Sequence, residues 1–311
     1  FAAFTVEDIP ATEAGRVNLE ALKARLGPDV AGVMITNPNT CGLFEREMKA
    51  ISDAVHAAGG YVYCDGANFN AIVGRVRPGD LGVDAMHINL HKTFSTPHGG
   101  GGPGSGPVVL SEALAPFAPL PFVTKHGDDF RLIEEENAGE DHPQTFGRMT
   151  AFHGQMGMFT RALTYILSHG ADGLKQVAED AVLNANYVLR SLEDVLDAPF
   201  AASGPCMHEA LFSDKGLAEG FSTLDIAKGL IDEGYHPMTV YFPLVVHGAM
   251  LVEPTETESK AVLDQFIGAL RSIAMRAKNG DPALKSAPHF APRARLDETL
   301  AARKPVLAWE D

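Results

Sequence analysis

A strand–helix–strand pattern near the start of the sequence constrains the fold of this chain most strongly. Residues 30–35 form an unbroken apolar run, which is typical of a strand buried on both faces. Apolar residues then recur at helical spacing over residues 48–58, and a glycine pair ends that run. A second apolar strand, residues 61–64, ends at Asp65. Because a strand, a crossover helix and a strand form a βαβ unit, the pattern predicts a parallel sheet in an α/β fold.

Polar residues follow consecutive predicted strands. Asn37 follows the first strand and Asp65 the second, and Lys92 follows a third strand predicted at residues 86–89. A glycine-rich loop, residues 99–106, comes next. Functional residues of a parallel sheet collect beyond the carboxyl ends of its strands. The order of these residues therefore predicts one crevice that they share.

These residue types match what pyridoxal phosphate requires of a protein. That cofactor needs a lysine amine for an imine link to its aldehyde, and a carboxylate beside its ring nitrogen. Its phosphate needs amide and hydroxyl donors. Lys92, Asp65 and the region of Thr93 and Gly99–Gly102 supply these groups in the expected order.

Each feature taken alone has an ordinary structural interpretation. A single lysine in a loop is usually solvated, an aspartate after a strand often caps a turn, and a glycine run is often a flexible linker. Their joint placement after consecutive strands favours the functional interpretation. A P-loop is excluded because no Gly-Lys-Ser/Thr follows the glycines. A Rossmann fingerprint is excluded because the glycines do not lie between a first strand and its helix.

The α/β domain is predicted to be followed by a smaller α+β domain. Residues 108–110 predict one more strand of the first sheet, and helical patterns then dominate residues 150–196, with a break at His169-Gly170. Short strands are expected at residues 210–212 and 244–246. We therefore divide the chain into the remainder of a large cofactor-binding domain, connecting helices, and a small domain with its tail, at residues 1–150, 151–196 and 197–311.

A long amphipathic helix is predicted from Glu256 to Lys278. Thr255 and Glu258 have the spacing of a capping box at its start. The apolar stripe expected to face the core consists of Val262, Phe266, Leu270 and Ile273.

Charge and cysteine content narrow the possible partners. The formal net charge of −15 disfavours binding to nucleic acid or to anionic membranes, and no apolar run approaches the length of a membrane span. The cysteines Cys41, Cys64 and Cys206 are scattered, without a CxxC, which argues against a disulfide framework or a zinc site. We expect no metal, and a reducing compartment.

Several segments resemble one family. Residues 89–104, Asn-Leu-His-Lys-Thr-Phe-Ser-Thr-Pro-His-Gly-Gly-Gly-Gly-Pro-Gly, resemble the cofactor-lysine motif of glycine decarboxylase, the P-protein of the glycine cleavage system. Residues 63–68 look like its aspartate motif, and residues 36–40 and 254–259 also match. The tail, residues 287–309, resembles the split form of the enzyme, specifically its cofactor-carrying subunit 2. The likeness runs from about residue 5 to the C-terminal end.

The resemblance implies a fold and a set of cofactor contacts. The fold would be that of a fold-type I pyridoxal-phosphate transferase, similar to aspartate aminotransferase. Lys92 would carry the cofactor, Asp65 would contact the pyridine nitrogen, and Ala67 would pack against the ring face. Asn37 would reach the phenolic oxygen.

Three further residues of the lysine motif are implicated by the same resemblance. His91 and Thr93 would lie near the phosphate or act in proton transfer, with His91 as a catalytic candidate. His98 would lie in the glycine loop near the mouth of the site. Both histidines are also open to a purely structural, hydrogen-bonded role.

The chain departs from the family pattern in two places. Residues 145–148 read Thr-Phe-Gly-Arg where the family usually has Ser-Ile-Gly-Arg, and residues 154–157 read Gly-Gln-Met-Gly for Gly-Asn-Phe-Gly. The family also has a long segment before the position of Phe1, which includes a histidine that stacks on the cofactor ring. We expect the full gene to extend upstream through a His-Gly-Thr-Asn-Pro-like motif.

The activity implied is decarboxylation of glycine with transfer of the aminomethyl group to the lipoyl arm of H-protein. The implied partners are P-protein subunit 1, in an α2β2 assembly, lipoylated H-protein and glycine, in the bacterial cytoplasm. Two alternatives remain open: another fold-type I enzyme acting on a different amino acid, and a non-catalytic subunit of a P-protein complex. Retention of both Lys92 and Asp65 argues against the second, because a scaffold needs neither.

Overall fold

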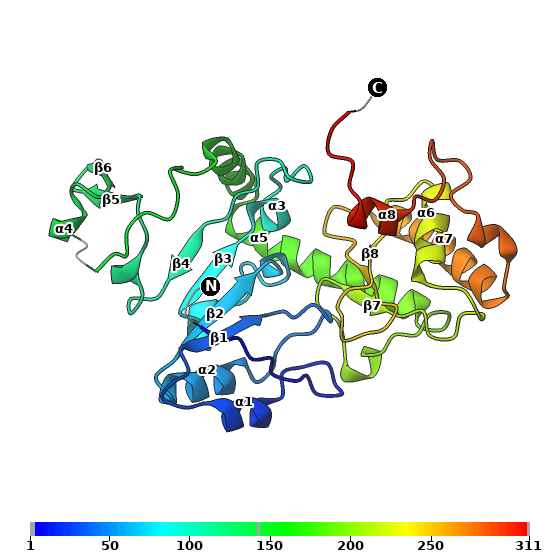
Figure 1. The fold of residues 1–311 in the computed structure, drawn as a ribbon, viewed down its shortest axis with the longest axis horizontal. Coiled ribbons are helices and arrows are strands. Elements are labelled where there is room, and N and C mark those ends of the chain that lie inside the picture. Colours follow the sequence, from blue (N-terminus) through cyan, green and yellow to red (C-terminus); the bar gives the residue numbers. More distant parts are fainter. Residues whose placement is uncertain (1–3, 142–143, 310–311) are drawn as a thin grey trace. The chain divides into compact units, whose positions relative to one another are not determined.

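The computed structural model describes residues 4–141 and 144–309 and divides into two compact units, Phe1–Val182 and Leu183–Asp311 (Figure 1). The boundary falls inside residues 151–196, the segment predicted to connect the domains. None of the helices in the described ranges has the length and apolar character needed to cross a membrane.

The first unit is built around a four-stranded sheet. Its order is β1-β2-β3-β4, with β1 parallel to β2, β2 parallel to β3, and β4 antiparallel to β3. The predicted parallel βαβ unit is therefore confirmed. The elements of the sheet and its crossovers are β1 (Gly32–Thr36), α2 (Met48–Ala57), β2 (Tyr61–Gly66), the 3-10 turns η1 (Phe69–Ala71) and η2 (Pro78–Leu81), β3 (Ala85–Ile88), α3 (Leu90–Thr93) and β4 (Val108–Leu110).

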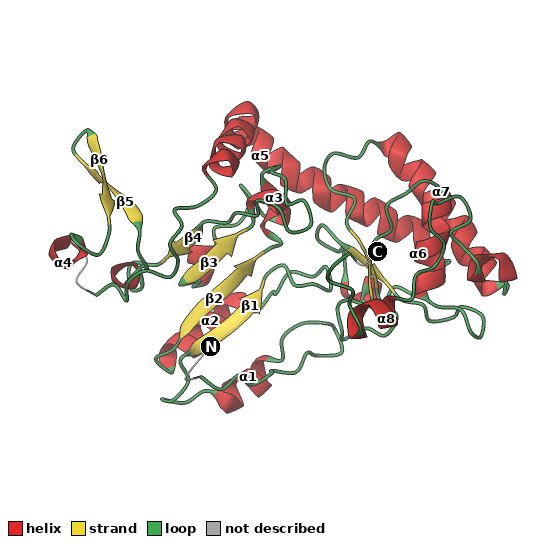
Figure 2. Cartoon of the chain, turned by 45° about the horizontal axis from the view of Figure 1, so that its top comes forward, coloured by secondary structure: helices red, strands yellow, loops and turns green. Residues whose placement is uncertain are grey.

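The two faces of this sheet differ sharply in burial. α1 (Leu19–Arg25) and α2 cover one face of the sheet (Figure 2). Their leucine, isoleucine and valine side chains form a core there with Ile35 and Val62. Val62, Cys64 and Gly66 of β2 alternate onto this buried face. Met34 points to the other face and is 69% exposed, so the prediction that the first strand is buried on both faces is wrong. Among the residues that the structure describes, β1 has a neighbouring strand on one side only.

The rest of the first unit extends from β4. The 3-10 turn η3 (Ala115–Phe117) leads to an antiparallel hairpin of β5 (Phe122–His126) and β6 (Asp129–Ile133), and α4 (Ala138–Asp141) follows. α5 (Met156–Leu192) then runs across the boundary into the second unit. It is interrupted at Gly170, whose φ of 63° and ψ of −174° are not helical. A left-handed φ favours glycine, so the predicted break at His169-Gly170 is confirmed.

The second unit packs helices against a small antiparallel sheet of order β7-β9-β8. The C-terminal part of α5 supplies Ala185, Val188 and Leu192 to the core beneath this sheet. The other elements are the 3-10 turn η4 (Ala201–Ser203), β7 (Ala210–Phe212), α6 (Thr223–Asp232), β8 (Thr239–Val240), β9 (Met250–Val252), α7 (Lys260–Lys278), η5 (Pro282–Lys285) and α8 (Glu298–Arg303).

The strand expected at residues 244–246 is absent. Val240 pairs with Met250, so residues 241–249 form the connection between β8 and β9. Leu244 is 86% exposed in that connection. A short apolar run indicated a strand, but the paired strands lie on either side of it.

The long helix begins later than predicted. α7 starts at Lys260 and is capped by Ser259, whose hydroxyl accepts a hydrogen bond from the Val262 amide at 3.4 Å. Thr255 has a φ of 59°, whereas an N-cap residue adopts an extended conformation, so the predicted capping box is wrong. The apolar stripe shifts accordingly, because Leu263 and Ile267 are buried beside Leu270 and Ile273.

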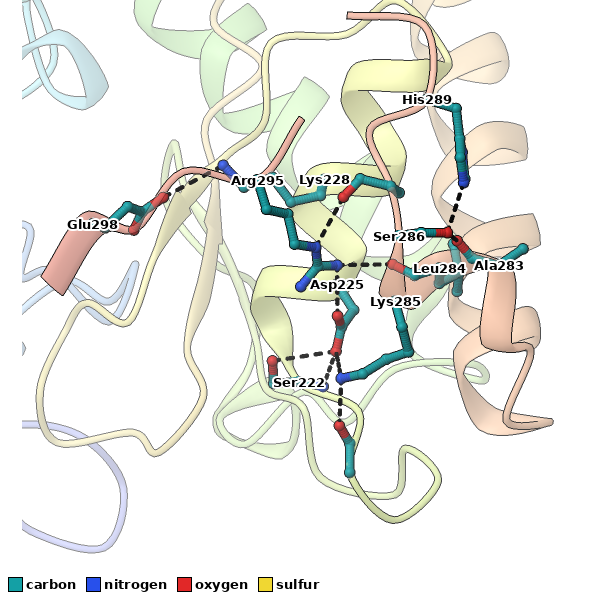
Figure 3. A network of polar contacts seen from close by, with 12 residues as sticks. Ser222, Asp225, Lys228, Ala283, Leu284, Lys285, Ser286, His289, Arg295 and Glu298 are labelled. Atoms are coloured by element: carbon teal, nitrogen blue, oxygen red, sulfur yellow. Dashed lines mark hydrogen bonds and ion pairs between the residues drawn. The ribbon is translucent and has the colours of Figure 1, made fainter. Parts of the chain in front are cut away.

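A buried carboxylate connects the tail of the second unit to α6 (Figure 3). Asp225 accepts hydrogen bonds from Arg295 at 2.7 Å, from Lys285 at 2.9 Å and from the Ser222 amide at 2.9 Å. Burial raises the pKa of Asp225, but the donors outweigh that effect and hold the pKa below its usual value. The negative charge of this carboxylate is therefore compensated by two cationic side chains and one backbone amide.

Candidate active site

The carboxyl ends of the parallel strands bring polar side chains to one sheet edge. In the strand register, Thr36 of β1 lies beside Asp65 of β2, and Asp65 lies beside His87 of β3. Tyr63 lies two residues before Asp65 and so shares its face. This face is opposite the one that α1 and α2 cover.

Asp65 is held by contacts from both β2 and β3. Its Oδ1 accepts a hydrogen bond from the Ala67 amide at 2.8 Å, which fixes the turn that follows β2. The same oxygen lies 3.2 Å from Nε2 of His87. The Tyr63 hydroxyl in turn lies 2.8 Å from Nδ1 of His87. Asp65 is thus the end of a chain of three polar groups.

Lys92 lies on α3, the short helix that begins directly after β3. Asn89 is the N-cap residue of this helix, and the side chain of Lys92 is exposed. α3 contacts η1, the turn that follows Asp65, and Leu90 and Phe94 pack into one apolar cluster with Phe69 and Val73. The structure therefore brings the segments of Lys92 and Asp65 together, as predicted from their positions after neighbouring strands.

Buried polar atoms without hydrogen-bond partners surround Lys92 in the sequence. They belong to Asn89 (Oδ1), His91 (Nδ1), Thr93 (Oγ1) and Thr96 (Oγ1). Buried polar groups are nearly always hydrogen-bonded in folded proteins, because an unsatisfied group costs about 1–3 kcal/mol. Four of them within eight residues indicate a site built to bind a polar ligand.

His91 and His98 lie against each other, with ring centroids 4.5 Å apart. Burial lowers the pKa of His91, and the neighbouring His98 and Lys92 lower it further. His91 is therefore kept neutral at physiological pH. His98 is exposed, and its Nδ1 accepts a hydrogen bond from the Gly100 amide at 3.2 Å.

Asn37 is buried between the first strand and the loop after it. Its Oδ1 accepts a hydrogen bond from the Glu45 amide at 3.0 Å. The side chain of Asn68 fixes the same loop by donating to the Pro38 carbonyl at 2.9 Å. Asn37 thus has a structural function in this loop, and its predicted contact to a phenolic oxygen stays a prediction.

One glycine makes the close approach of β2 and β3 possible. A Cβ added at Gly66 would lie 1.8 Å from the His87 carbonyl oxygen. Any larger residue at position 66 would therefore push β3, and the His87 side chain with it, away from Asp65.

The residues present fit pyridoxal phosphate. An exposed amine, a carboxylate on the neighbouring strand end and unpartnered buried hydroxyls are the groups that this cofactor needs for its aldehyde, ring nitrogen and phosphate. Lys92, Asp65, Ala67, Thr93, His91 and His98 all lie on segments of the first unit that meet at or follow this edge.

Four residues of this edge were missed by reasoning from the sequence: Tyr63, His87, Asn89 and Thr96. Tyr63 and His87 could have been found from period-two alternation, because each lies two residues from another member of its strand face. The contact between them depends on strand register, which no local pattern gives. Asn89 and Thr96 belong to the motif quoted for Lys92, but their burial depends on tertiary packing.

A separate cluster lies in the second unit. Ligand atoms of His208, Glu209 and Glu253 lie within 4.8 Å of one another, and it is the one such group among the residues that the structure describes. Nε2 of His208 is 3.7 Å from Glu209 and 3.9 Å from Glu253. Pairing of Ala210 with Val252 brings the two glutamates together. We assign no metal to it.

The sheet topology and the lysine–aspartate edge define the chain as a fold-type I protein, the class that includes pyridoxal-phosphate transferases. More specifically, the chain belongs to the aminotransferase class-V family, whose model matches residues 1–201. The model of the glycine dehydrogenase C-terminal domain matches residues 177–289.

Curated relatives that match nearly the whole chain share one description. A protein of Caulobacter vibrioides described as "Probable glycine dehydrogenase (decarboxylating) subunit 2" is 68% identical over 100% of this chain and 59% of its own length. A protein of Oceanobacillus iheyensis with the same description is 50% identical over 99% of this chain and 62% of its own length. The chain therefore spans about three-fifths of the length of these relatives. The likeness to glycine decarboxylase inferred from motifs is confirmed.

Solved structures show the same fold. A glycine decarboxylase (P-protein) of the glycine cleavage system, in inhibitor-bound form, superimposes with a TM-score of 0.68 at 20% identity, over 84% of this chain and 58% of that chain. A cysteine desulfurase from Thermococcus onnurineus NA1 gives a TM-score of 0.62 at 15% identity, over 86% of this chain and 66% of its own.

Proposed function

We propose that the full-length protein uses pyridoxal phosphate to decarboxylate glycine and transfers the remaining aminomethyl group to the lipoyl arm of an H-protein. The observation that carries this proposal is the meeting of the Lys92 and Asp65 segments at one sheet edge, beside buried polar atoms that have no partner. Glycine is proposed as the substrate because the relatives are described as glycine dehydrogenases.

The cofactor, when bound, supplies an aldehyde for covalent attachment and an electron-poor ring that accepts the electron pair released as carbon dioxide leaves. Lys92 would hold the cofactor through its amine, and Asp65 would keep the ring nitrogen protonated by placing a negative charge beside it. Ala67, at the start of the turn after β2, would pack against the ring face.

The lysine motif would bind the phosphate and handle protons. Thr93 has a buried hydroxyl without a partner, which can donate to a phosphate oxygen. His91 is held neutral, so its unpartnered Nδ1 can donate or accept a proton, depending on its tautomer. His98, exposed beside the glycine loop, would line the mouth of the site.

We further propose a complex with a second, different subunit. The description "subunit 2" of the relatives implies a subunit 1, and we expect an α2β2 assembly that receives lipoylated H-protein. Met156, Phe159, Leu163 and Leu167 form an exposed apolar stripe on α5, which suits contact with another protein. A cytoplasmic location is proposed, because the three cysteines are scattered along the sequence without a CxxC, which suits a reducing compartment.

Exchange of labelled bicarbonate into the carboxyl group of glycine tests the proposal. The full-length protein, with subunit 1, pyridoxal phosphate and lipoylated H-protein, should catalyse this exchange, and omission of H-protein should reduce it strongly. Borohydride reduction followed by peptide mapping should place the cofactor on residue 92.

Two results would replace the proposal. Cofactor trapped on Lys92 with exchange into another amino acid, but not glycine, would establish a different fold-type I enzyme. No cofactor bound by the complete complex would establish a non-catalytic subunit.

A further inference from the structure

The contact between β2 and β3 at the sheet edge suggests a role for two residues outside the lysine and aspartate positions. Tyr63 and Asp65 lie on the same face of β2, and His87 lies beside Asp65 on β3. The Tyr63 hydroxyl is 2.8 Å from Nδ1 of His87, and Nε2 of His87 is 3.2 Å from Oδ1 of Asp65. The three side chains are half-buried, so water competes with these contacts only partly.

The direction of these contacts follows from the carboxylate, which can only accept, so its contact with Nε2 places the imidazole proton there and leaves Nδ1 to accept from the tyrosine. Burial and the Asp65 charge raise the pKa of Tyr63, so its hydroxyl stays protonated and can donate. A neutral imidazole carries one proton, and a donor at Nδ1 places that proton on Nε2. Nε2 is the nitrogen that faces Asp65.

We propose that Tyr63 and His87 are positioning residues for Asp65: the tyrosine fixes the histidine tautomer, and the histidine holds Oδ1 of the carboxylate. The Ala67 amide donates to the same oxygen. Oδ2 of Asp65 has no hydrogen-bond donor within residues 4–141 and 144–309. The carboxylate is therefore oriented with one oxygen anchored in the sheet and the other presented to a ligand.

This inference rests on the proposed function, because the ligand presented to Oδ2 is the ring nitrogen of the cofactor. A carboxylate that rotates freely would place its charge at the ring nitrogen for only part of the time. In the proposed tautomer, His87 adds no positive charge that would compete with the ring for the carboxylate. Tyr63 and His87 thus orient Asp65 without weakening its negative charge.

Substitution of His87 tests the histidine in the full-length protein with its partner subunit. His87→Gln retains a side-chain N–H donor near the position of Nε2 and needs no tautomer, whereas His87→Phe removes the donor. We expect His87→Phe to weaken binding of pyridoxal phosphate about tenfold or more, since a hydrogen bond to a charged group is lost, and His87→Gln to stay within about threefold of the wild type. The dissociation constant is measured by absorbance titration of the cofactor-free protein.

A double-mutant cycle tests the tyrosine. Tyr63→Phe should weaken cofactor binding about fivefold in the wild-type protein, but should have no further effect in the His87→Gln protein, where no tautomer remains to be fixed. Tyr61→Phe is the matched control, because Tyr61 is exposed on the same strand and its hydroxyl makes no hydrogen bond to the described residues.

The tautomer itself gives a readout that needs no cofactor. Nitrogen-15 spectra of histidine-labelled, cofactor-free protein should show His87 protonated on Nε2, and Tyr63→Phe should add the Nδ1-protonated form. A doubly protonated or Nδ1-protonated His87 in the wild type would overturn the inference, as would His87→Gln binding the cofactor as weakly as His87→Phe. If the wild type binds no cofactor but shows the expected tautomer, the proposed function fails and the positioning contact remains.

Discussion

Two buried polar regions of this molecule are built in opposite ways. Around Asp225, in the second unit, the carboxylate has a donor for each oxygen, from Arg295, Lys285 and the Ser222 amide. Around Lys92, in the first unit, four buried polar atoms have no donor or acceptor at all. Satisfied groups stabilise a fold, whereas unsatisfied ones cost stability and are kept where a ligand completes them.

Cofactor binding and stability therefore depend on different regions of this chain. Changes around Asp225 should alter the free energy of unfolding and leave cofactor chemistry alone. Changes around Lys92 should alter cofactor chemistry without destabilising the cofactor-free protein. A variant near Lys92 that destabilises the fold, or a variant near Asp225 that alters the cofactor spectrum, would contradict this division.

Lys92→Ala should have the largest effect. Because the amine proposed to attach the cofactor is lost, the visible absorbance of the bound cofactor should disappear and activity should fall to background. The side chain is exposed, so the thermal unfolding of the cofactor-free protein should not change. An unchanged visible spectrum would refute the assignment.

Asp65→Asn should still bind the cofactor, but at least about tenfold more weakly than the wild type, and should reduce turnover about 100-fold or more, since the ring loses the negative charge proposed to keep its nitrogen protonated. Bicarbonate exchange measures the turnover, and absorbance titration measures the binding. Near-normal exchange would mean that Asp65 does not act on the ring.

Asp225→Ala should destabilise the second unit by about 3 kcal/mol, because Lys285 and Arg295 lose a buried partner. Chemical denaturation measures the change, while the cofactor spectrum should be unaffected. A protein as stable as the wild type would show that this network contributes nothing.

The same carboxylate predicts a pH dependence. Since the folded state holds the pKa of Asp225 below the ordinary value of 3.8, its stabilising contribution is present above that value and is lost as pH falls through the lower, folded pKa. Acid unfolding of the Asp225→Ala protein should therefore be less steep below pH 3.8 than that of the wild type. Equal slopes would assign the acid sensitivity to other groups.

Thr93→Val should have the smallest effect on function of the variants near Lys92. It tests directly whether the unpartnered atoms serve binding and not stability. No hydrogen bond of the cofactor-free protein is lost and an unsatisfied buried hydroxyl is removed, so its free energy of unfolding should stay the same or rise, by up to about 1–3 kcal/mol. Affinity for pyridoxal phosphate should fall about tenfold, because the hydroxyl intended for the phosphate is gone. A large loss of stability with unchanged affinity would reverse the interpretation of the unpartnered atoms.

Much of this molecule follows from local sequence. The βαβ unit, the strands at Val108–Leu110 and Ala210–Phe212, and the helix break at Gly170 are all confirmed, because side-chain periodicity and glycine each act within a few residues. The placement of Lys92 and Asp65 near one edge also follows, since parallel strands end at the same edge of a sheet.

Only the tertiary structure decided the contacts between elements. The Tyr63–His87–Asp65 contacts depend on the register of β2 against β3, and the antiparallel direction of β4 depends on the path of the glycine loop. The start of α7 at Ser259 rather than Thr255 was decided by a backbone conformation that a capping pattern does not specify. Periodicity describes one element at a time, whereas register and burial arise from packing between residues far apart in the chain.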